Sequence, residues 1–156
     1  DLDKKAKEEL NLAYEVSLEA THHGPGELEV PVCFVEVGST PEQWRDKRAA
    51  EAVARAALAA LSPSHCKQAV GVGGVHYPPL HTRVMLETLV APGHILPRYA
   101  PISEELIELA VKRTAGGVDM IVADWKGLSA DQRMACRRAA ERLGIPMVRA
   151  SALLKK

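Results

Sequence analysis

Aromatic residues are scarce in this sequence, which has one Phe, three Tyr and two Trp among 156 residues. Ala, Val, Leu and Ile must therefore supply most of the buried surface. A row of exposed rings that stacks single-stranded bases is excluded for the same reason. Long apolar runs are also lacking, so we expect no membrane-spanning helix.

Cysteine is rare too, and the three residues of this type, Cys33, Cys66 and Cys136, form no Cys-x-x-Cys pair. This spacing favours a reduced, cytoplasmic protein over a disulfide scaffold. The length suits a sizeable core, so we expect residues 1–156 to form a single α/β domain. Because the first residue is Asp1 rather than Met, we expect that an amino-terminal part of the natural chain is missing.

Apolar strand patterns alternate with helix patterns along the chain. The expected strands and extended segments cover residues 14–20, 30–37, 69–76, 93–99, 118–123 and 145–148. The expected helices follow the capping residues Thr40, Ser103 and Ser129 or begin at Leu80, and the first of them runs to Leu61. This alternation predicts an α/β fold with a mixed or mostly parallel sheet flanked by helices.

Five of the six histidines lie beside Gly or Pro at the expected edges of loops. His22 and His23 end the first expected strand, His76 follows a Gly-rich segment, and His94 follows Gly93. Ligands of open α/β sheets bind just outside the carboxyl ends of the strands. We therefore predict that His22, His23, His76 and His94 converge in one pocket.

The Gly-rich segment before His76 is neither a dinucleotide fingerprint nor a phosphate loop. Instead it leads into Pro78-Pro79 and a helix whose first turn would contain His81 and Thr82. Free N–H groups at a helix amino terminus attract an oxyanion or a carboxylate. We accordingly predict substrate contacts from Gly73, Gly74, Tyr77, His81, Thr82 and Lys126.

Glu36 is the one charged residue in the otherwise apolar run Val30–Val37. A carboxylate in a buried strand must be paired, hydrogen-bonded or protonated. Glu36 could therefore orient a histidine or hold a ligand group, and it could equally cap the amides of a neighbouring loop.

The net charge is zero, but the charges are unevenly distributed. Residues 1–111 contain 10 Lys and Arg against 16 Asp and Glu, whereas residues 112–156 contain 10 against 4. An RNA-binding helix is one interpretation of this basic segment. It would use Arg133, Arg137, Arg138 and Arg142. The alternative is a solvated helix face whose arginines pair with Glu104, Glu105 or Glu108.

Five ordered motifs carry a family resemblance: EATHHGP at 19–25, FVEVGST at 34–40, VGGVHYPPLHT at 72–82, GHILPRYA at 93–100 and DWKGL at 124–128. Together they resemble the archaeal and plant D-aminoacyl-tRNA deacylase family. The resemblance implies a fold akin to peptidyl-tRNA hydrolases and nucleoside phosphorylases, and hydrolysis of the ester between a D-amino acid and tRNA. It also implies zinc as cofactor, and a chain that is the carboxy-terminal portion of a longer one.

On this basis, we expect a monomeric cytoplasmic enzyme that acts on D-aminoacyl-tRNA. The expected catalytic residues are His22, His23, Glu36 and His76. The expected zinc ligands are His22, His76 and His94, because catalytic zinc usually has about three protein ligands.

Three alternatives remain open at the level of the sequence. A metal-free reaction would use a histidine as general base, oriented by Glu36 or Glu19. A nucleoside phosphorylase or another small-molecule hydrolase would hold phosphate at the Gly-rich turn. A non-catalytic RNA-binding module would use the arginine helix and keep the histidines as structural residues.

Overall fold

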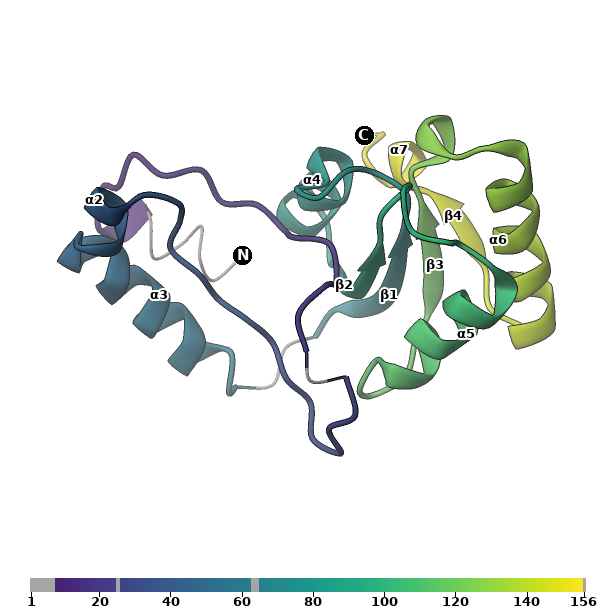
Figure 1. Cartoon of the computed structure of the whole chain (residues 1–156), viewed down its shortest axis with the longest axis horizontal. Helices are drawn as coiled ribbons and strands as arrows, with labels where there is room; N and C mark the ends of the chain where they lie inside the picture. The colour runs from purple at the N-terminus through teal and green to yellow at the C-terminus, as the bar shows by residue number, and fades with distance from the viewer. Residues whose placement is uncertain (1–7, 25, 63–64, 156) are drawn as a thin grey trace. The chain divides into compact units, whose positions relative to one another are not determined.

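The structure is a computed structural model that describes residues 8–24, 26–62 and 65–155 (Figure 1). The chain divides into two compact units. The first unit contains Asp1–Val16 and Val32–His65, and the second contains Ser17–Pro31 and Cys66–Lys156. The expectation of a single domain stays a prediction.

The second unit is built on a four-stranded parallel sheet, which confirms the expected α/β fold. The strand order is β2-β1-β3-β4. The strands are β1 (Lys67–Val72), β2 (Val90–Leu96), β3 (Met120–Ala123) and β4 (Met147–Arg149). The helices of this unit are α4 (Pro79–Glu87), α5 (Glu104–Arg113), the 3-10 turn η1 (Trp125–Gly127), α6 (Ala130–Leu143) and α7 (Ala150–Leu153).

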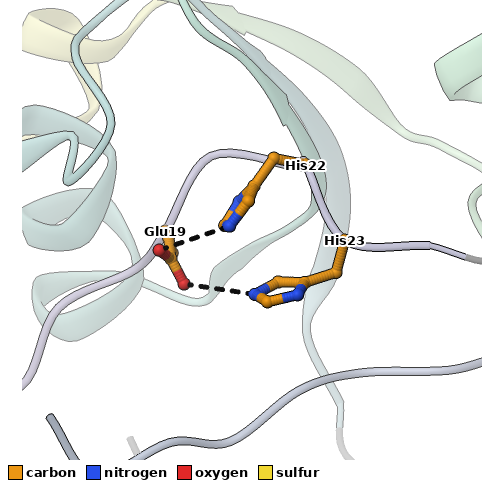
Figure 2. A group of neighbouring side chains, drawn as sticks. All are labelled: Glu19, His22 and His23. Atoms are coloured by element: carbon orange, nitrogen blue, oxygen red, sulfur yellow. Dashed lines mark ion pairs between the residues drawn. The ribbon is translucent and has the colours of Figure 1, made fainter.

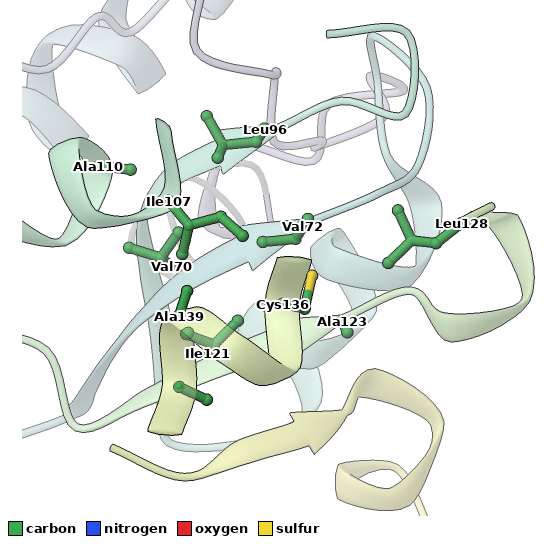
Figure 3. Packing of buried hydrophobic residues seen from close by; sticks show 11 residues of the cluster. Val70, Val72, Leu96, Ile107, Ala110, Ile121, Ala123, Leu128, Cys136 and Ala139 are labelled. Carbon is green, nitrogen blue, oxygen red and sulfur yellow. The ribbon is translucent and has the colours of Figure 1, made fainter. Parts of the chain in front are cut away.

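Buried apolar side chains lie on both faces of this sheet because successive strand residues point to opposite sides. Ile121 faces α5 and α6, where Ile107 and Cys136 complete the larger core (Figure 3). Val122, the next residue, faces α4 and α7. Burial raises the pKa of the Cys136 thiol to about 11, so this cysteine is a neutral packing group.

Local sequence signals explain where the helices of the second unit begin and end. Ser129 Oγ accepts a hydrogen bond from Gln132 N, and Gln132 Oε1 accepts one from Ser129 N, which closes the expected capping box of α6. Gly144 ends α6 in the left-handed conformation with φ 66°. Ser103 Oγ caps α5 by accepting a hydrogen bond from Leu106 N.

In the described part of the first unit, two helices, α2 (Pro41–Trp44) and α3 (Lys47–Ala59), lie where the sequence predicts one continuous helix. Asp46 separates them, because its carboxylate accepts hydrogen bonds from Arg48 N and Ala49 N and thereby caps α3. Tyr14 donates a hydrogen bond to the second carboxylate oxygen of Asp46 at 3.0 Å. Asp side chains compete with helical hydrogen bonding in this way, and here the competition interrupts the helix.

Two expected strands, residues 14–20 and 30–37, are wrong: both segments lack regular secondary structure. Val30, Val32 and Phe34 are 54–65% exposed, so the apolar run is not covered on both faces. An apolar pattern predicts an extended backbone, but a strand also needs a hydrogen-bonded neighbour. Across the described residues, no helix is long and apolar enough to cross a membrane.

Candidate functional site

The segment Leu18–Thr21 lies along the carboxyl ends of β1 and β2 and is held there by three hydrogen bonds from its backbone N–H groups. All of these contacts are within the second unit. The three hydrogen bonds are Leu18 N to Thr82 Oγ1 at 3.0 Å, Ala20 N to His76 O at 2.8 Å, and Thr21 N to Ile95 O at 3.0 Å. Because Thr82 belongs to α4, His76 follows β1 and Ile95 belongs to β2, three different parts of the second unit hold the segment. This attachment places Glu19 and the following histidines at the sheet edge where α/β proteins bind ligands.

Glu19 is the centre of the side-chain cluster at this edge. Its Oε1 lies 2.6 Å from His76 Nε2 and 3.7 Å from His22 Nε2, and its Oε2 lies 3.9 Å from His23 Nε2. Figure 2 shows the imidazoles of His22 and His23 turned toward the same carboxylate. We call Glu19, His22, His23 and His76 the histidine cluster.

The rings of the histidine cluster lie close together, tilted against one another, and remain accessible. The ring centroid of His22 lies 4.1 Å from that of His23 and 4.7 Å from that of His76. The three imidazoles are 37–40% exposed and the Glu19 side chain is 24% exposed. A substrate can therefore reach all four side chains without a change of fold.

The tautomer of His22 follows from its backbone partner. His22 Nδ1 lies 2.7 Å from Ala20 O, and a carbonyl oxygen only accepts, so Nδ1 carries a proton. In the neutral ring, Nε2 then has the lone pair that a general base or a metal ligand needs. This lone pair lies beside the negatively charged Glu19 carboxylate. The two electron-rich groups repel each other, so the arrangement becomes favourable when a proton or a cation lies between them.

His76 connects Glu19 with Tyr99. Because Nε2 donates to Glu19, the neutral ring has its lone pair on Nδ1, which lies 3.3 Å from the Tyr99 hydroxyl. The Tyr77 ring stands edge-on to His76 at 4.8 Å between centroids. A carboxylate, an imidazole and a phenol therefore form a continuous chain of hydrogen-bonding groups.

His94 lies next to the histidine cluster and has a different partner. Thr21 Oγ1 accepts a hydrogen bond from Ile95 N at 3.0 Å and lies 3.3 Å from His94 Nδ1, where the tautomer of His94 decides which group donates. Among the described residues, the group of potential metal ligands contains Glu19, His22 and His23, whose ligand atoms all lie within 4.8 Å of one another. His76 and His94 are not part of this group, although the sequence predicts both as zinc ligands.

His81 and Thr82, two predicted substrate-binding residues, are buried under the site. The His81 ring is 0% exposed, and neither ring nitrogen makes a hydrogen bond within the described part of the chain. Burial lowers the pKa of His81, and the nearby Asp124 charge only partly offsets this effect. The Thr82 hydroxyl donates to Pro78 O and accepts from Leu18 N, so it holds the backbone of the site.

The other predicted contact residues lie in several places. Gly73 and Gly74 form the turn after β1 with φ 96° and 88°, where a Cβ on Gly74 would meet Pro78 at 2.9 Å. Tyr77 and Lys126 are exposed. Glu36 is exposed in the first unit and does not lie in a buried strand, so that expectation is wrong, whereas its catalytic role stays a prediction.

The four arginines of α6 separate into two pairs. Arg138 and Arg142 form ion pairs with Glu104 of α5, and Arg142 also pairs with Glu108. This is the arrangement that the alternative to RNA binding predicts. Arg133 and Arg137 instead lie against the Trp125 ring.

Several residues of these clusters are not singled out by the sequence. The sequence suggests Glu19 only as an alternative to Glu36 for orienting a histidine, although its close spacing from His22 and His23 could have indicated a shared site. Thr21, Tyr99 and Arg149 carry no spacing signal, because their partners lie on other elements. The tertiary structure is what brings them into the site or next to Trp125.

Comparisons with known proteins agree with the motifs. A family model described as D-aminoacyl-tRNA deacylase matches residues 2–148. The D-aminoacyl-tRNA deacylase of Thermococcus kodakarensis is 48% identical over 146 residues, and that of Methanosarcina barkeri is 37% identical over 155 residues. The alignments cover 90% and 98% of this chain but 54% and 50% of the relatives, so the chain spans about half of their length.

A solved structure has the same fold. The crystal structure of a conserved protein of unknown function matches with a TM-score of 0.87 and 34% sequence identity. The match covers 97% of this chain and 54% of that protein. From the family model, the identities and the shared fold it follows that this chain belongs to the D-aminoacyl-tRNA deacylase family.

Proposed function

We propose that the chain hydrolyses the ester bond between a D-amino acid and tRNA at the histidine cluster. The products are the free D-amino acid and a tRNA with its terminal hydroxyl restored. The observation that carries the proposal is one carboxylate shared by three accessible imidazoles at the carboxyl edge of a parallel sheet. The names of the relatives support the choice of substrate.

His22 is the proposed proton acceptor of a metal-free reaction. Its Nδ1–H is held by Ala20 O, so Nε2 can take a proton from water while the water oxygen attacks the acyl carbon. The bond from the acyl carbon to the ribose oxygen then breaks, and that oxygen takes up a proton. His22 returns the proton that it accepted, and the Glu19 carboxylate 3.7 Å from Nε2 stabilises its protonated form until then. His76 holds this carboxylate in position through the contact of 2.6 Å between Nε2 and Oε1.

Zinc fits the same residues. Glu19, His22 and His23 offer one carboxylate oxygen and two imidazole nitrogens within 4.8 Å of one another, and zinc takes this donor set. The lone pair of His22 Nε2 beside the Glu19 carboxylate supports a cation between them. When bound, zinc would lower the pKa of a water molecule and polarise the ester carbonyl. His76 would then fix the carboxylate orientation through its hydrogen bond to Oε1.

Release of labelled D-amino acid from D-aminoacyl-tRNA tests the proposal. The chain should release the amino acid faster than the uncatalysed reaction, and the exposed His65→Gln should retain this activity. His22→Gln should reduce the rate by about 10²-fold or more, because it removes the proton acceptor. Equal rates with and without the protein would overturn the proposal.

A chelator separates the two chemistries. Loss of activity on chelation, with recovery on added zinc, supports the metal site at Glu19, His22 and His23. Full activity in a sample shown to contain no metal supports His22 as the base and contradicts the zinc proposal.

A further inference from the structure

Three arginine side chains surround one indole ring at the carboxyl ends of β3 and β4. The guanidinium carbons of Arg133, Arg137 and Arg149 lie 5.2, 5.0 and 4.9 Å from the centre of the Trp125 ring. Each distance is within the range of a cation–π contact. We call these four residues the Trp125 cluster.

The members of the Trp125 cluster come from three elements. Trp125 begins η1, which follows β3; Arg133 and Arg137 lie on α6; and Arg149 is the last residue of β4. Arg133 Nε also donates a hydrogen bond to Trp125 O at 2.9 Å, which fixes the guanidinium against the turn. The tertiary fold, and not the periodicity of a single helix, therefore brings the three arginines together.

The arginines of this cluster have no carboxylate partner among the described residues. Within residues 8–24, 26–62 and 65–155, no ion pair involves Arg133, Arg137 or Arg149, whereas Arg138 and Arg142 on the same helix pair with glutamates of α5. Three like charges around one ring repel one another, and the indole face offsets only part of this repulsion. Arg137 and Arg149 are exposed, so an external anion can bind them.

The anion that fits best is the phosphate backbone of RNA. Guanidinium groups bind phosphate oxygens in a bidentate manner, and several of them side by side match a chain of phosphates rather than one small ion. The Trp125 cluster also lies on the same sheet edge as the histidine cluster, because Trp125 follows β3 and His76 follows the neighbouring strand β1. Adjacent strands are about 4.8 Å apart, so one nucleic acid can reach both clusters.

We propose that the Trp125 cluster binds the phosphate backbone of the tRNA near its acylated end, while Arg138 and Arg142 serve the contact between α6 and α5. The proposal names the contact surface for the tRNA of the proposed function and in that respect rests on it. The binding step itself needs no ester chemistry, so it can be tested with tRNA that carries no amino acid.

The test compares two double variants that remove the same charge from the protein. Arg137→Gln with Arg149→Gln changes the Trp125 cluster, and Arg138→Gln with Arg142→Gln changes the paired arginines. Binding of unacylated tRNA is measured by fluorescence anisotropy over a range of salt concentrations. Thermal unfolding of both variants verifies that each remains folded.

The first double variant should bind more weakly, and the slope of log K against log salt should fall by about 1.4–1.8, the value for two lost phosphate contacts. The second should keep the slope of the unchanged chain. An equal fall in both variants would show a general effect of charge and would overturn the proposal, as would an unchanged slope in both.

The emission of Trp125 gives a second readout. In a Trp44→Phe background, Trp125 is the only tryptophan, so its emission should change saturably as unacylated tRNA is added. No change at saturation would contradict the proposal. If the chain releases no D-amino acid but the Trp125 cluster still controls the salt slope, the proposed function fails and the RNA-binding surface stands.

Discussion

Glu19 Oε1 and His76 Nε2 lie 2.6 Å apart, although Glu19 belongs to an irregular extended segment and His76 follows a strand. The same two places are joined in the backbone by Ala20 N and His76 O at 2.8 Å. The backbone contact sets the register of the segment against the sheet, and the side-chain contact then fixes the carboxylate among the imidazoles. Each half of the site therefore depends on the other for its position.

Loss of the Glu19 charge should impair catalysis more than it impairs folding. Glu19→Gln keeps the size of the side chain but removes the negative charge that holds His76 and faces His22 and His23. We expect kcat/KM for D-aminoacyl-tRNA to fall by about 10²-fold or more. The control is Glu15→Gln, which changes an exposed carboxylate. Similar kcat/KM values for the two variants would contradict a central role of Glu19.

Zinc binding should distinguish the histidine cluster from His94. After chelation, zinc titrated into His22→Ala or His23→Ala should bind far more weakly than into the unchanged chain, because each variant removes one of the clustered ligands. His94→Ala should bind zinc normally, since His94 lies outside this group of ligands. Calorimetric titration measures these affinities. Weak zinc binding in both His94→Ala and His22→Ala, with normal binding in His23→Ala, would favour the ligand set that the sequence predicts.

Thr82 should support the site through the backbone. Thr82→Val leaves Leu18 N and Pro78 O without their partner, which should cost about 1–3 kcal/mol of stability. It should also lower kcat, because Leu18 precedes Glu19. Thr88→Val is a matched control: its hydroxyl also donates to the carbonyl four residues earlier and accepts from a backbone N–H, but far from the histidine cluster.

Both threonine variants should lower the midpoint of urea unfolding, and only Thr82→Val should lower kcat under conditions where both remain folded. If Thr88→Val reduced kcat as much as Thr82→Val, the effect would be one of general stability rather than of site geometry.

His81 should make the stability depend on pH. Its pKa is lowered by burial, so below a pH of about 6.5 the unfolded chain binds a proton that the folded chain does not. The free energy of unfolding should therefore fall as the pH drops below about 6.5, by at most about 1.4 kcal/mol per pH unit from this residue. The contribution is complete above that pH and is lost as the pH approaches the lowered pKa of the folded state.

His81→Leu should flatten this dependence, because an apolar side chain of similar size does not titrate. Urea unfolding at several pH values between about 7.5 and 5.5 measures the slope, across the unperturbed pKa of histidine. His65→Gln, a change at an exposed histidine, should leave the slope as it is. An equally steep slope in His81→Leu would mean that His81 does not titrate differently in the folded and unfolded states.

Local residue chemistry determined much of the fold of the second unit. The capping box of Ser129 with Gln132, the Ser103 cap and the left-handed Gly144 each act within one turn of the backbone, so they are visible in the sequence. The strands β1 and β3 can also be predicted from their apolar runs, because strands buried on both faces need continuous apolar residues. The same reasoning failed for residues 30–37, because a single sequence does not contain the pairing partner that a strand requires.

The site shows the same division. The Gly and Pro residues that follow or precede His22, His23 and His76 indicated that these histidines lie at the sheet edge, since strand ends and turns are local features. The depth of His81, the pairing of His94 with Thr21 and the partition of the α6 arginines between glutamates and Trp125 depend on which elements pack together. Those contacts join residues that are distant in the sequence, and only packing of the sheet against its helices decides which side chains meet.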